Sequence, residues 1–393
     1  MATKIIPEVE TFARIKVVGV GGSGRNAINH MINSHVKGVD FVAINTDAQD
    51  LHHSLAKHKV HIGKNLTRGL GTGMNPATGK QAAEETKEEV QESLKGADMV
   101  FIACGMGGGT GTGAAPIVAR TAKELGALTI AVTTRPFSFE GAQRGRLAEQ
   151  GLDELRKEVD ALIVIPNDRL LSVVDKQTTA RSAFAMCDDI LRQAVEGISD
   201  IIVTPGIINV DFADVRAIME NAGSALMGIG LASGEKRAEE AAKSAINSPL
   251  LDISINGAKG VLFAIAGGDD ITMHEIQEAA KIITESIDPN AKVIFGAIKD
   301  EKLKKNEIRV TVIATGFPES EISKQEPIFQ LKKQEMKQED REEKRTETPI
   351  IKTISPVIPT MKENKVENKP LPPNEDDSDW GAVPAFLRRN KIK

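Results

Sequence analysis

Short apolar runs rich in β-branched residues alternate with longer amphipathic stretches over the first half of the chain. Strands are predicted at Ile15–Val20, Val39–Ile44, Met99–Cys104, Leu128–Thr134 and Ala161–Ile165. Apolar residues between them follow a helical period, for example over Lys80–Leu94 and Ile117–Leu125. Strands that are apolar throughout and joined by helices are typical of a parallel sheet covered on both faces. The pattern predicts an α/β fold built on a Rossmann-like parallel sheet.

A long amphipathic segment follows the last of these strands. Its apolar residues recur at every third or fourth position and are Phe184, Cys187, Leu191, Ala194, Ile198 and Ile201. This spacing predicts one long central helix over residues 179–203. Beyond it, the chain pattern predicts further elements at Thr272–Ile287 (helix) and at Gly260–Ala266, Lys292–Ile298 and Ile308–Ala314 (strands). We therefore expect a smaller α+β domain over residues 204–316.

The composition changes near Gly316. The segment Leu331–Arg345 holds 11 charged residues among 15, and Pro318–Pro384 carries 9 of the 17 prolines. Such a stretch buries too little apolar surface to offset its ordering entropy, so we expect a disordered linker over residues 317–379. An exposed charged helix over residues 330–345 is the alternative. The first eleven residues are also expected to be flexible.

A small apolar island, Trp380–Arg389, ends the linker. An apolar motif beyond a flexible tether usually binds a partner, which predicts a partner-binding peptide over residues 380–393. An apolar end without a partner is the alternative.

Composition and charge exclude several function classes. Aromatic residues make up 3% of the 393 residues, which removes the stacking platforms of single-stranded nucleic-acid binders. The net charge of −5 also argues against a nucleic-acid partner. Cys104 and Cys187 form no CxxC pattern, so neither a disulfide framework nor a zinc site is expected. Because no signal sequence and no apolar run of about 18 residues is found, we expect a cytoplasmic protein without a membrane span.

Two glycine loops follow predicted strands. Gly19, Gly21 and Gly24 satisfy GxGxxG, and a helix N-terminus behind such a loop offers free N–H groups to a phosphate. This loop alone does not separate a mononucleotide from a dinucleotide, and a tight turn without a ligand is the alternative.

The second loop, Gly105–Gly113, has six glycines among nine residues. It precedes a helix expected to begin at Ala114, with Pro116 in its first turn. Backbone amides in series form an anion-binding concavity, to which the Thr110 and Thr112 hydroxyls can add donors. Two such loops at the same end of neighbouring parallel strands should converge on one ligand.

Other motifs fit less well. Between Gly73 and Gly79-Lys80 lies one residue too many for a Walker A loop, and Gln81 replaces its Ser or Thr. A nicotinamide-dependent oxidoreductase, with Asp40 or Asp47 as the ribose-binding acid, remains a rival, but it leaves the second loop unused. No metal site is expected from the histidines, which lack nearby Cys or acid pairs and are His52, His53, His58 and His61.

Several motifs together resemble a known family. Gly107–Gly113 is similar to the signature loop of the tubulin superfamily. The segments Gly19–Asn26, Asn45–Gln49 and Asn209–Arg216 resemble those of the FtsZ family of bacterial cell-division GTPases. The similarity covers about residues 12–316 and resumes at the tail, and the motifs agree in order and spacing. The chain is identified as a member of this family.

The resemblance implies that GTP or GDP binds to a domain over residues 12–178. The implied phosphate contacts are Gly21, Gly22, Ser23, Gly24, Arg25, Gly107, Gly108, Gly109, Thr110 and Gly111. Loops near the γ-phosphate would supply Asp47, Gly71, Thr72 and Gly73. Mg²⁺ would be held through phosphates and water, and a requirement for K⁺ is left open. Ser23 and Arg25 stand where a family loop can carry glycine or asparagine.

The resemblance also implies contacts to the sugar and the base. Glu140 would contact the ribose and Arg144 the nucleotide, although by themselves they would be a surface i,i+4 pair. The implied guanine contacts are Asn26, Asn167, Phe184 and Asp188. A carboxylate there suits guanine, because its N1–H and amino group donate together, whereas adenine offers no such pair.

The segment Asn209–Arg216 has two interpretations. By spacing alone, Asp211 would cap a helix over Val215–Met219, with Asp214 in its first turn. The family instead places Asn209, Asp211 and Asp214 against the nucleotide of the next subunit, where they complete the catalytic site. The resemblance thus implies head-to-tail protofilaments that form a contractile division ring at the mid-cell septum. A scaffold that binds GTP and assembles without turnover is the rival.

The tail has an implied role as well. By the resemblance, membrane-tethering and regulatory division proteins would bind a peptide that includes Pro384, Phe386, Leu387 and Arg388.

Overall fold

The computed structural model describes residues 13–171, 177–248, 255, 257–300 and 302–317. The expected linker beyond Phe317 and the expected partner-binding peptide, with Pro384, Phe386, Leu387 and Arg388, lie outside the described residues. The expected flexible N-terminus over residues 1–11 also lies outside them.

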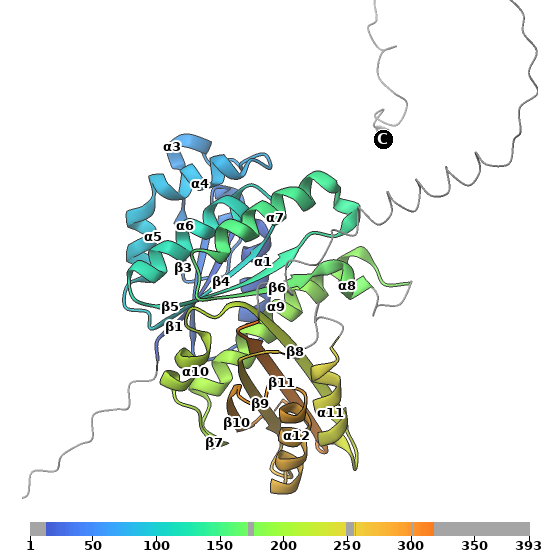
Figure 1. The fold of residues 1–393 in the computed structure, drawn as a ribbon. Helices are drawn as coiled ribbons and strands as arrows, with labels where there is room; N and C mark the ends of the chain where they lie inside the picture. The colour runs from blue at the N-terminus through green and yellow to red at the C-terminus, as the bar shows by residue number, and fades with distance from the viewer. Residues whose placement is uncertain (1–12, 172–176, 249–254, 256, 301, 318–393) are drawn as a thin grey trace, which may run out of the picture. The chain divides into compact units, whose positions relative to one another are not determined.

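In the described part of the chain, eleven strands form one sheet in the order β3-β2-β1-β4-β5-β6-β8-β11-β9-β10-β7 (Figure 1). The first six strands are parallel where they pair. They are β1 (Ile15–Val20), β2 (Val39–Asn45), β3 (His58–His61), β4 (Met99–Gly105), β5 (Leu128–Arg135) and β6 (Ala161–Pro166). The predicted α/β fold with a parallel sheet is confirmed.

The sheet continues without a break into the second half of the described chain. The remaining strands are β7 (Gly206–Ile208), β8 (Gly223–Ser233), β9 (Gly260–Gly267), β10 (Lys292–Lys299) and β11 (Glu307–Thr315). β8 pairs in parallel with β6, beginning at Ala161 opposite Gly223. β11 runs antiparallel between β8 and β9. The division at residues 178, 203 and 316 stays a prediction.

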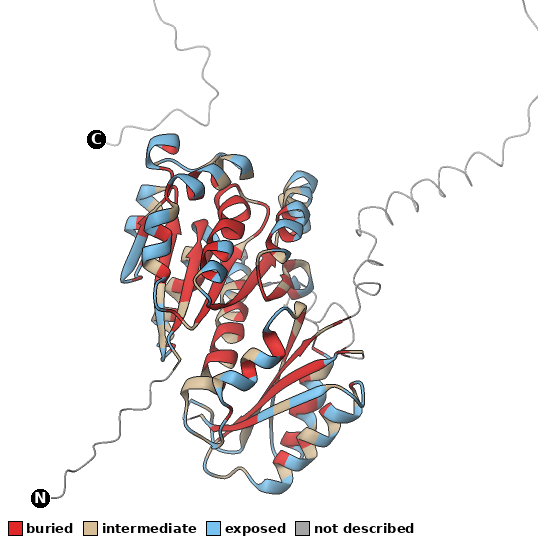
Figure 2. Ribbon diagram, turned by 60° about the vertical axis from the view of Figure 1, so that its left-hand side comes forward, coloured by how far each residue is buried: buried red, intermediate tan, exposed pale blue. Residues whose placement is uncertain are grey.

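Helices cover both faces of the sheet, and the buried strands lie between them (Figure 2). Alternate strand residues face opposite layers: Val17 packs in the cluster with α1 and α9, whereas Val18 packs in the cluster with α4 to α7. The helices are α1 (Gly21–Asn33), α2 (Ala48–His52), α3 (Lys64–Thr67), α4 (Pro76–Glu85), α5 (Lys87–Leu94), α6 (Thr110–Glu124), α7 (Ala142–Arg156), α8 (Asn167–Leu171), α9 (Ala180–Val203), α10 (Phe212–Met219), α11 (Arg237–Ile246) and α12 (Met273–Glu285). The predicted long central helix is α9.

Two helix predictions were wrong in detail. The helix expected over Lys80–Leu94 is broken into α4 and α5 at Thr86. The Thr86 hydroxyl donates to the carbonyl of Ala82 and accepts from the Gly63 N–H, both at 2.9 Å, so it holds the chain at the break.

The second helix difference concerns α6, which begins at Thr110 rather than Ala114. Pro116 therefore lies inside the helix instead of in its first turn. The sequence did not predict this earlier start, because the loop is rich in glycine, which disfavours helix in isolation.

β8 was not among the strands named from the sequence, because Gly228 and Gly230 interrupt its apolar pattern. In the structure a Cβ at either position would overlap a backbone carbonyl of α11, at Ala245 or Ala241. These glycines therefore allow the helix to lie close against the strand. Among the described helices, none is long and apolar enough to cross a membrane.

Candidate functional site

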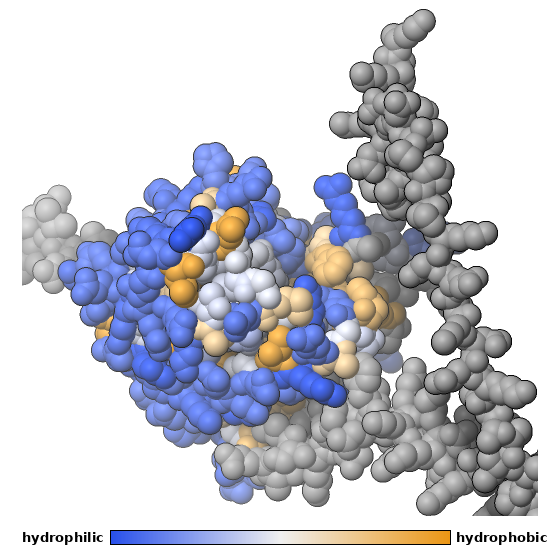
Figure 3. All heavy atoms as spheres, turned by 90° about the horizontal axis from the view of Figure 1, so that it is seen from above, coloured by the Kyte–Doolittle hydropathy of each residue, from blue (hydrophilic) through white to orange (hydrophobic). Residues whose placement is uncertain are grey.

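A cavity of about 440 Å³ opens at the carboxyl ends of β1 and β4. These strands are neighbours in the sheet. After β1 the chain forms β2 and β3 on one side of β1, and it then returns to form β4 on the other side. Such a reversal of strand order is where open α/β sheets bind ligands. Figure 3 looks onto this end and shows pale residues of intermediate hydropathy within a mostly hydrophilic face.

Most residues predicted for the site line this cavity. They are Gly21, Gly22, Ser23, Asn26, Thr72, Gly73, Gly108, Gly109, Thr110, Gly111, Glu140, Arg144, Asn167, Phe184 and Asp188. They come from the segments that follow five parallel strands, β1, β3, β4, β5 and β6, and from α9, so that residues more than a hundred positions apart meet at one cavity.

Two helices begin at the wall of the cavity. α1 starts at Gly21 and α6 at Thr110, and no side chain of the described residues caps the first N–H groups of either helix. Free N–H groups and the positive end of the helix dipole favour an anion at both places. The two helix ends together fit a polyphosphate.

The second glycine loop serves packing as well as ligand binding. A Cβ placed on Gly108 would meet no atom of the described chain within 4 Å, because this residue faces the open cavity. A Cβ on Gly113 would instead overlap the Pro76 carbonyl, so α4 lies close on α6 only because this residue is glycine. The Thr112 hydroxyl accepts a hydrogen bond from the Gly107 N–H at 2.9 Å, and Thr112 is not among the cavity residues. The Thr112 side chain therefore stabilises the loop and does not face the cavity.

An acid and an arginine close another side of the cavity. Glu140 ends the short 3₁₀ helix η1 (Ser138–Glu140), and its Oε1 accepts from the Phe137 N–H at 2.9 Å. Arg144, in the first turn of α7, forms an ion pair with Oε2 of the same carboxylate. The acid is thus held in place with its charge partly balanced.

The far end of the cavity is lined by α8 and α9. Asn167 is buried, and its Oδ1 has no hydrogen-bond partner within the part of the chain that the structure describes. A buried acceptor without a partner costs about 1–3 kcal/mol, and a ligand donor would remove that cost. Phe184 is 46% exposed and packs edge-on against Phe137 with ring centroids 5.3 Å apart.

Asp188 is the titratable group at this end. Burial raises the pKa of its carboxyl to about 6, although His30 and Arg25 act in the opposite direction. A desolvated carboxylate of this kind gains from a ligand that offers hydrogen-bond donors.

The segment with Asn209, Asp211 and Asp214 lies near the amino ends of the parallel strands, whereas the cavity lies at their carboxyl ends. Asp211 caps α10, its Oδ1 accepting from the Ala213 N–H at 3.3 Å, which confirms the capping interpretation of its spacing. Arg216 of α10 donates to the carbonyl of Asp98, directly before β4. β4 has seven residues, so this edge is about 20 Å from the cavity. The two acids therefore do not reach the cavity of their own chain.

Comparison with known proteins adds the family. Residues 14–175 match the Tubulin/FtsZ family GTPase domain, and residues 223–318 match the FtsZ family C-terminal domain. An FtsZ dimer from M. jannaschii is 48% identical, with 78% of this chain and 89% of that chain covered and a TM-score of 0.75. The chain belongs to the FtsZ family.

Further solved structures agree with this assignment. A tryptophan-to-tyrosine mutant of M. jannaschii FtsZ is 47% identical, with 78% of this chain and 92% of that chain covered and a TM-score of 0.75. CetZ1 from Haloferax volcanii, described as a GDP-bound monomer, is 20% identical, with 78% of this chain and 94% of that chain covered and a TM-score of 0.68. The latter shows the shared fold. The resemblance seen in the sequence motifs is confirmed.

Some predicted site residues of this FtsZ-family chain do not line the cavity. They are Gly24, Arg25, Asp47, Gly71 and Gly107. Gly24 leaves no room for a Cβ beside the Ala103 carbonyl, which places it in the packing of α1 on the sheet. Asp47 caps α2 by accepting from the Asp50 N–H at 3.0 Å, and Arg25 forms an ion pair with Asp50.

Other cavity residues were not among the individually predicted contacts, although Gly105 and Met106 belong to the predicted anion-binding loop. They are Val20, Met74, Gly105, Met106, Thr134, Pro136, Cys187 and Leu191. Cys187 and Leu191 were assigned to the apolar core stripe of α9, and they are buried, but they also share a helix face with Phe184. Their spacing of three and seven residues from Phe184 was the available signal. Thr134 and Pro136 lie at the end of β5, where position at the carboxyl edge was the only clue.

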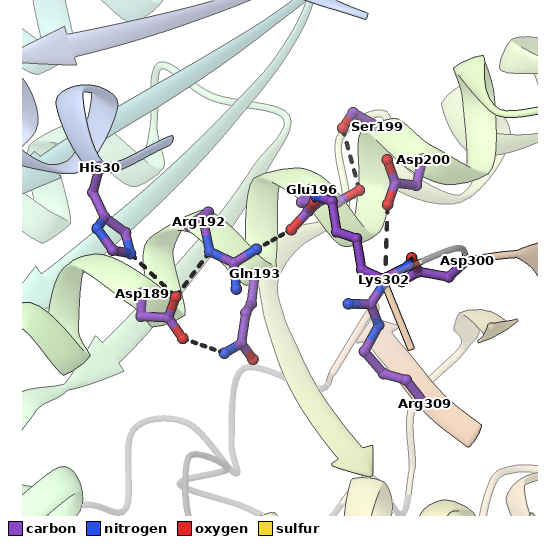
Figure 4. Close-up of polar contacts among 10 residues, drawn as sticks. All are labelled: His30, Asp189, Arg192, Gln193, Glu196, Ser199, Asp200, Asp300, Lys302 and Arg309. Carbon is purple, nitrogen blue, oxygen red and sulfur yellow. Dashed lines mark hydrogen bonds and ion pairs between the residues drawn. The ribbon is translucent and has the colours of Figure 1, made fainter. Parts of the chain in front are cut away.

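Beyond the cavity, α9 carries a line of charges toward the β10–β11 connection of this FtsZ-family fold (Figure 4). His30 Nε2 lies 3.2 Å from Asp189 Oδ1, which also accepts from Arg192 Nε at 2.8 Å. Arg192 pairs with Glu196, which accepts from Lys302 Nζ at 2.6 Å. Within the described residues, no group of three or more His, Cys, Asp or Glu side chains could hold a metal ion.

Proposed function

We propose that this chain binds GTP in the cavity and hydrolyses it in a head-to-tail polymer, where the next subunit completes each active site. The observation that carries this proposal is the separation of the two predicted half-sites. The cavity opens at the carboxyl ends of the parallel strands, and Asp211 and Asp214 are exposed at the amino ends. Stacking one subunit on another in the same direction brings these two edges together.

The cavity suits guanine nucleotide. Phosphate oxygens would accept from the first N–H groups of α1 and α6, and Glu140 would accept from ribose hydroxyls. The two oxygens of Asp188 would accept from N1–H and the amino group of guanine, and adenine cannot donate to both. The Oδ1 of Asn167, which accepts no hydrogen bond from any described residue, supports a ligand with donors at this end.

Hydrolysis would use the exposed acids of the neighbouring subunit. Asp211 and Asp214 would orient a water for in-line attack on the γ-phosphorus, with Asn209 beside them. The bond between the γ-phosphorus and the bridging oxygen breaks, and the diphosphate leaves. Mg²⁺, held mainly by phosphate oxygens and water, would offset the charge on the phosphates.

A heterologous contact of this kind does not close on itself, so repeating it builds a filament. The M. jannaschii relative is described as an FtsZ dimer, which supports association of like chains. In the cell, such filaments would form the division ring in the cytoplasm at the mid-cell septum. The tail peptide containing Pro384, Phe386, Leu387 and Arg388 would bind the membrane-tethering and regulatory proteins.

The first test is the GTP hydrolysis rate per molecule against protein concentration in Mg²⁺ buffer. We expect a threshold followed by a plateau, because isolated subunits lack half of the site. A rate per molecule that is constant at all concentrations would contradict shared sites. Binding of GTP without hydrolysis at any concentration would favour a scaffold, and binding of a nicotinamide cofactor instead would favour an oxidoreductase.

Mixing two inactive variants tests the shared site more directly. Asp211→Ala keeps the cavity intact, and Asp188→Ala keeps α10 intact. In an equimolar mixture the hydrolysis rate should recover to about a quarter of wild type, because random assembly joins the two intact faces in about one contact in four. Sedimentation checks that the variants assemble together. A co-assembled mixture that stays inactive would show that the site is not shared in this way.

A further inference from the structure

Arg25 is the fifth residue of α1 and does not line the cavity. Its Nη2 forms an ion pair with Asp50 Oδ1, and both side chains are only 20% exposed. Asp50 belongs to α2, which follows β2. The pair therefore ties the loop after β1 to the loop after β2.

Asp50 in turn organises the loop between β2 and α2. Its second oxygen, Oδ2, accepts from Asn45 Nδ2 at 2.7 Å. The Oδ1 of Asn45 accepts from the Thr46 N–H at 2.8 Å, and Asp50 itself donates its N–H to Asp47. The polar groups of residues 45–50 thus form one connected set with the Arg25 guanidinium at its end.

This loop lies between the two helix ends that line the cavity. On one side, Asp50 Oδ2 is 3.8 Å from a Cβ placed on Gly22 of α1. On the other side, the buried Thr46 hydroxyl lies 2.8 Å from that of Thr110, the first residue of α6. A shift of the loop would change the spacing of both phosphate-facing helix ends.

We propose that the Arg25–Asp50 pair is a positioning clamp that sets the preference of the site for nucleoside triphosphate over diphosphate. The inference rests on the proposed function. Residues 45–50 join the two helix ends and so set the distance between them, and a triphosphate chain is long enough to engage both ends. A diphosphate is one phosphate shorter, spans less of that distance and depends on the clamp less. Arg25 then acts through Asp50 and does not contact the nucleotide.

The test measures affinity of the full chain for GDP and for a non-hydrolysable GTP analogue, at protein concentrations below assembly. Arg25→Ala and Asp50→Ala should each lower analogue affinity about five- to tenfold and GDP affinity less than twofold. The double variant should be no worse than either single variant, because both remove the same link. Arg25→Lys, which keeps the charge, should recover most of the loss.

Other outcomes would overturn the clamp. If the pair acts only as charge, Arg25→Ala would weaken and Asp50→Ala would strengthen binding of both nucleotides. If it only stabilises the fold, both affinities would fall together with the melting temperature. Arg120→Ala is the matched control: it removes an arginine–carboxylate pair with Glu158, which lies shortly before β6, and should change neither affinity. If the wild-type chain binds neither nucleotide, the proposed function fails before the clamp is tested.

Discussion

Two neighbouring aspartates on α9 differ in how strongly they hold a proton. Burial raises the pKa of Asp188 to about 6. Burial alone would also raise the pKa of Asp189, but hydrogen bonds from Arg192 and His30 bring it below its usual value. Asp188 lines the cavity and receives no such hydrogen bonds from the described residues, so its carboxylate can accept hydrogen bonds from a ligand.

This difference predicts a pH dependence of nucleotide affinity. Above pH 6 Asp188 is charged and can accept two hydrogen bonds from guanine. As the pH falls below 6 it takes up a proton, loses an acceptor, and GDP affinity should fall. Asp188→Asn should lower GDP affinity at least about tenfold near neutral pH, because one amide oxygen replaces two carboxylate oxygens.

The measurement is titration of GDP against both proteins from mildly acidic to mildly basic pH. The phosphates of GDP titrate in the same range, so the difference between wild type and Asp188→Asn isolates the carboxyl. The variant should also bind the xanthine analogue better than the guanine nucleotide, because an amide donates to the second carbonyl of xanthine. Parallel pH profiles for the two proteins would count against Asp188 as the base contact.

At the scale of elements, the contact between α4 and α6 depends on glycine. Gly113→Ala should destabilise the fold by about 1–3 kcal/mol, because its Cβ has no space beside the Pro76 carbonyl. Gly108→Ala is the matched change in the same loop, where the Cβ meets open space in the cavity. We expect it to keep the melting temperature and to weaken nucleotide binding. Thermal melts and GDP titrations of both variants separate the roles, and equal melting temperatures would contradict the packing role of Gly113.

The elements also show how far the sequence alone reaches. Apolar strands such as β1 and β4 were predicted to within a residue, because parallel strands buried on both faces are apolar throughout. The break at Thr86 was missed, since it depends on a hydrogen bond from Gly63, which is distant in sequence. β8 was missed because its glycines are set by the close approach of α11. In the site, local motifs located the two glycine loops, but the helices behind them begin earlier than expected, at Gly21 and Thr110, and the Arg25–Asp50 pair needed the fold.

At the scale of the whole molecule, α9 joins the cavity to the strands of the C-terminal half. Asp200 near its end is partly buried, with 20% of its side chain exposed. This burial, with Glu196 and Asp300 nearby, raises the pKa of the carboxyl to about 6, against the opposing effect of Arg309 and Lys302. Arg309 Nη2 lies 4.0 Å from Asp200 but 2.7 Å from Asp300, so Asp200 is the weaker partner (Figure 4).

Asp200 should therefore lower stability at neutral pH. Its folded pKa is above its unfolded value, so the folded state binds the proton more tightly, and stability falls as pH rises from about 4 to 6. Asp200→Asn removes this loss and should unfold with up to about 3 kcal/mol more free energy at about pH 8, with little difference at about pH 4.

The control for that prediction is Asp189→Asn. The pKa of Asp189 is lowered, so the contribution of its carboxylate is present at neutral pH and lost as the pH falls. Its replacement should reduce stability at mildly basic pH. Denaturant unfolding of both variants at the same acidic and basic pH values checks the opposite signs, and a destabilised Asp200→Asn at basic pH would contradict the assignment.

The cavity and α10 lie at opposite ends of the parallel strands, and this placement has a consequence for filaments of limited length. In the proposed stacking, every filament has one terminal subunit whose cavity faces solvent and another whose acids face solvent. A dimer then has one complete site for two chains, whereas a long filament approaches one per chain. Turnover per subunit becomes a measure of filament length. The nucleotide at the open terminus stays uncleaved until another subunit arrives, so each filament carries a triphosphate cap at one end only.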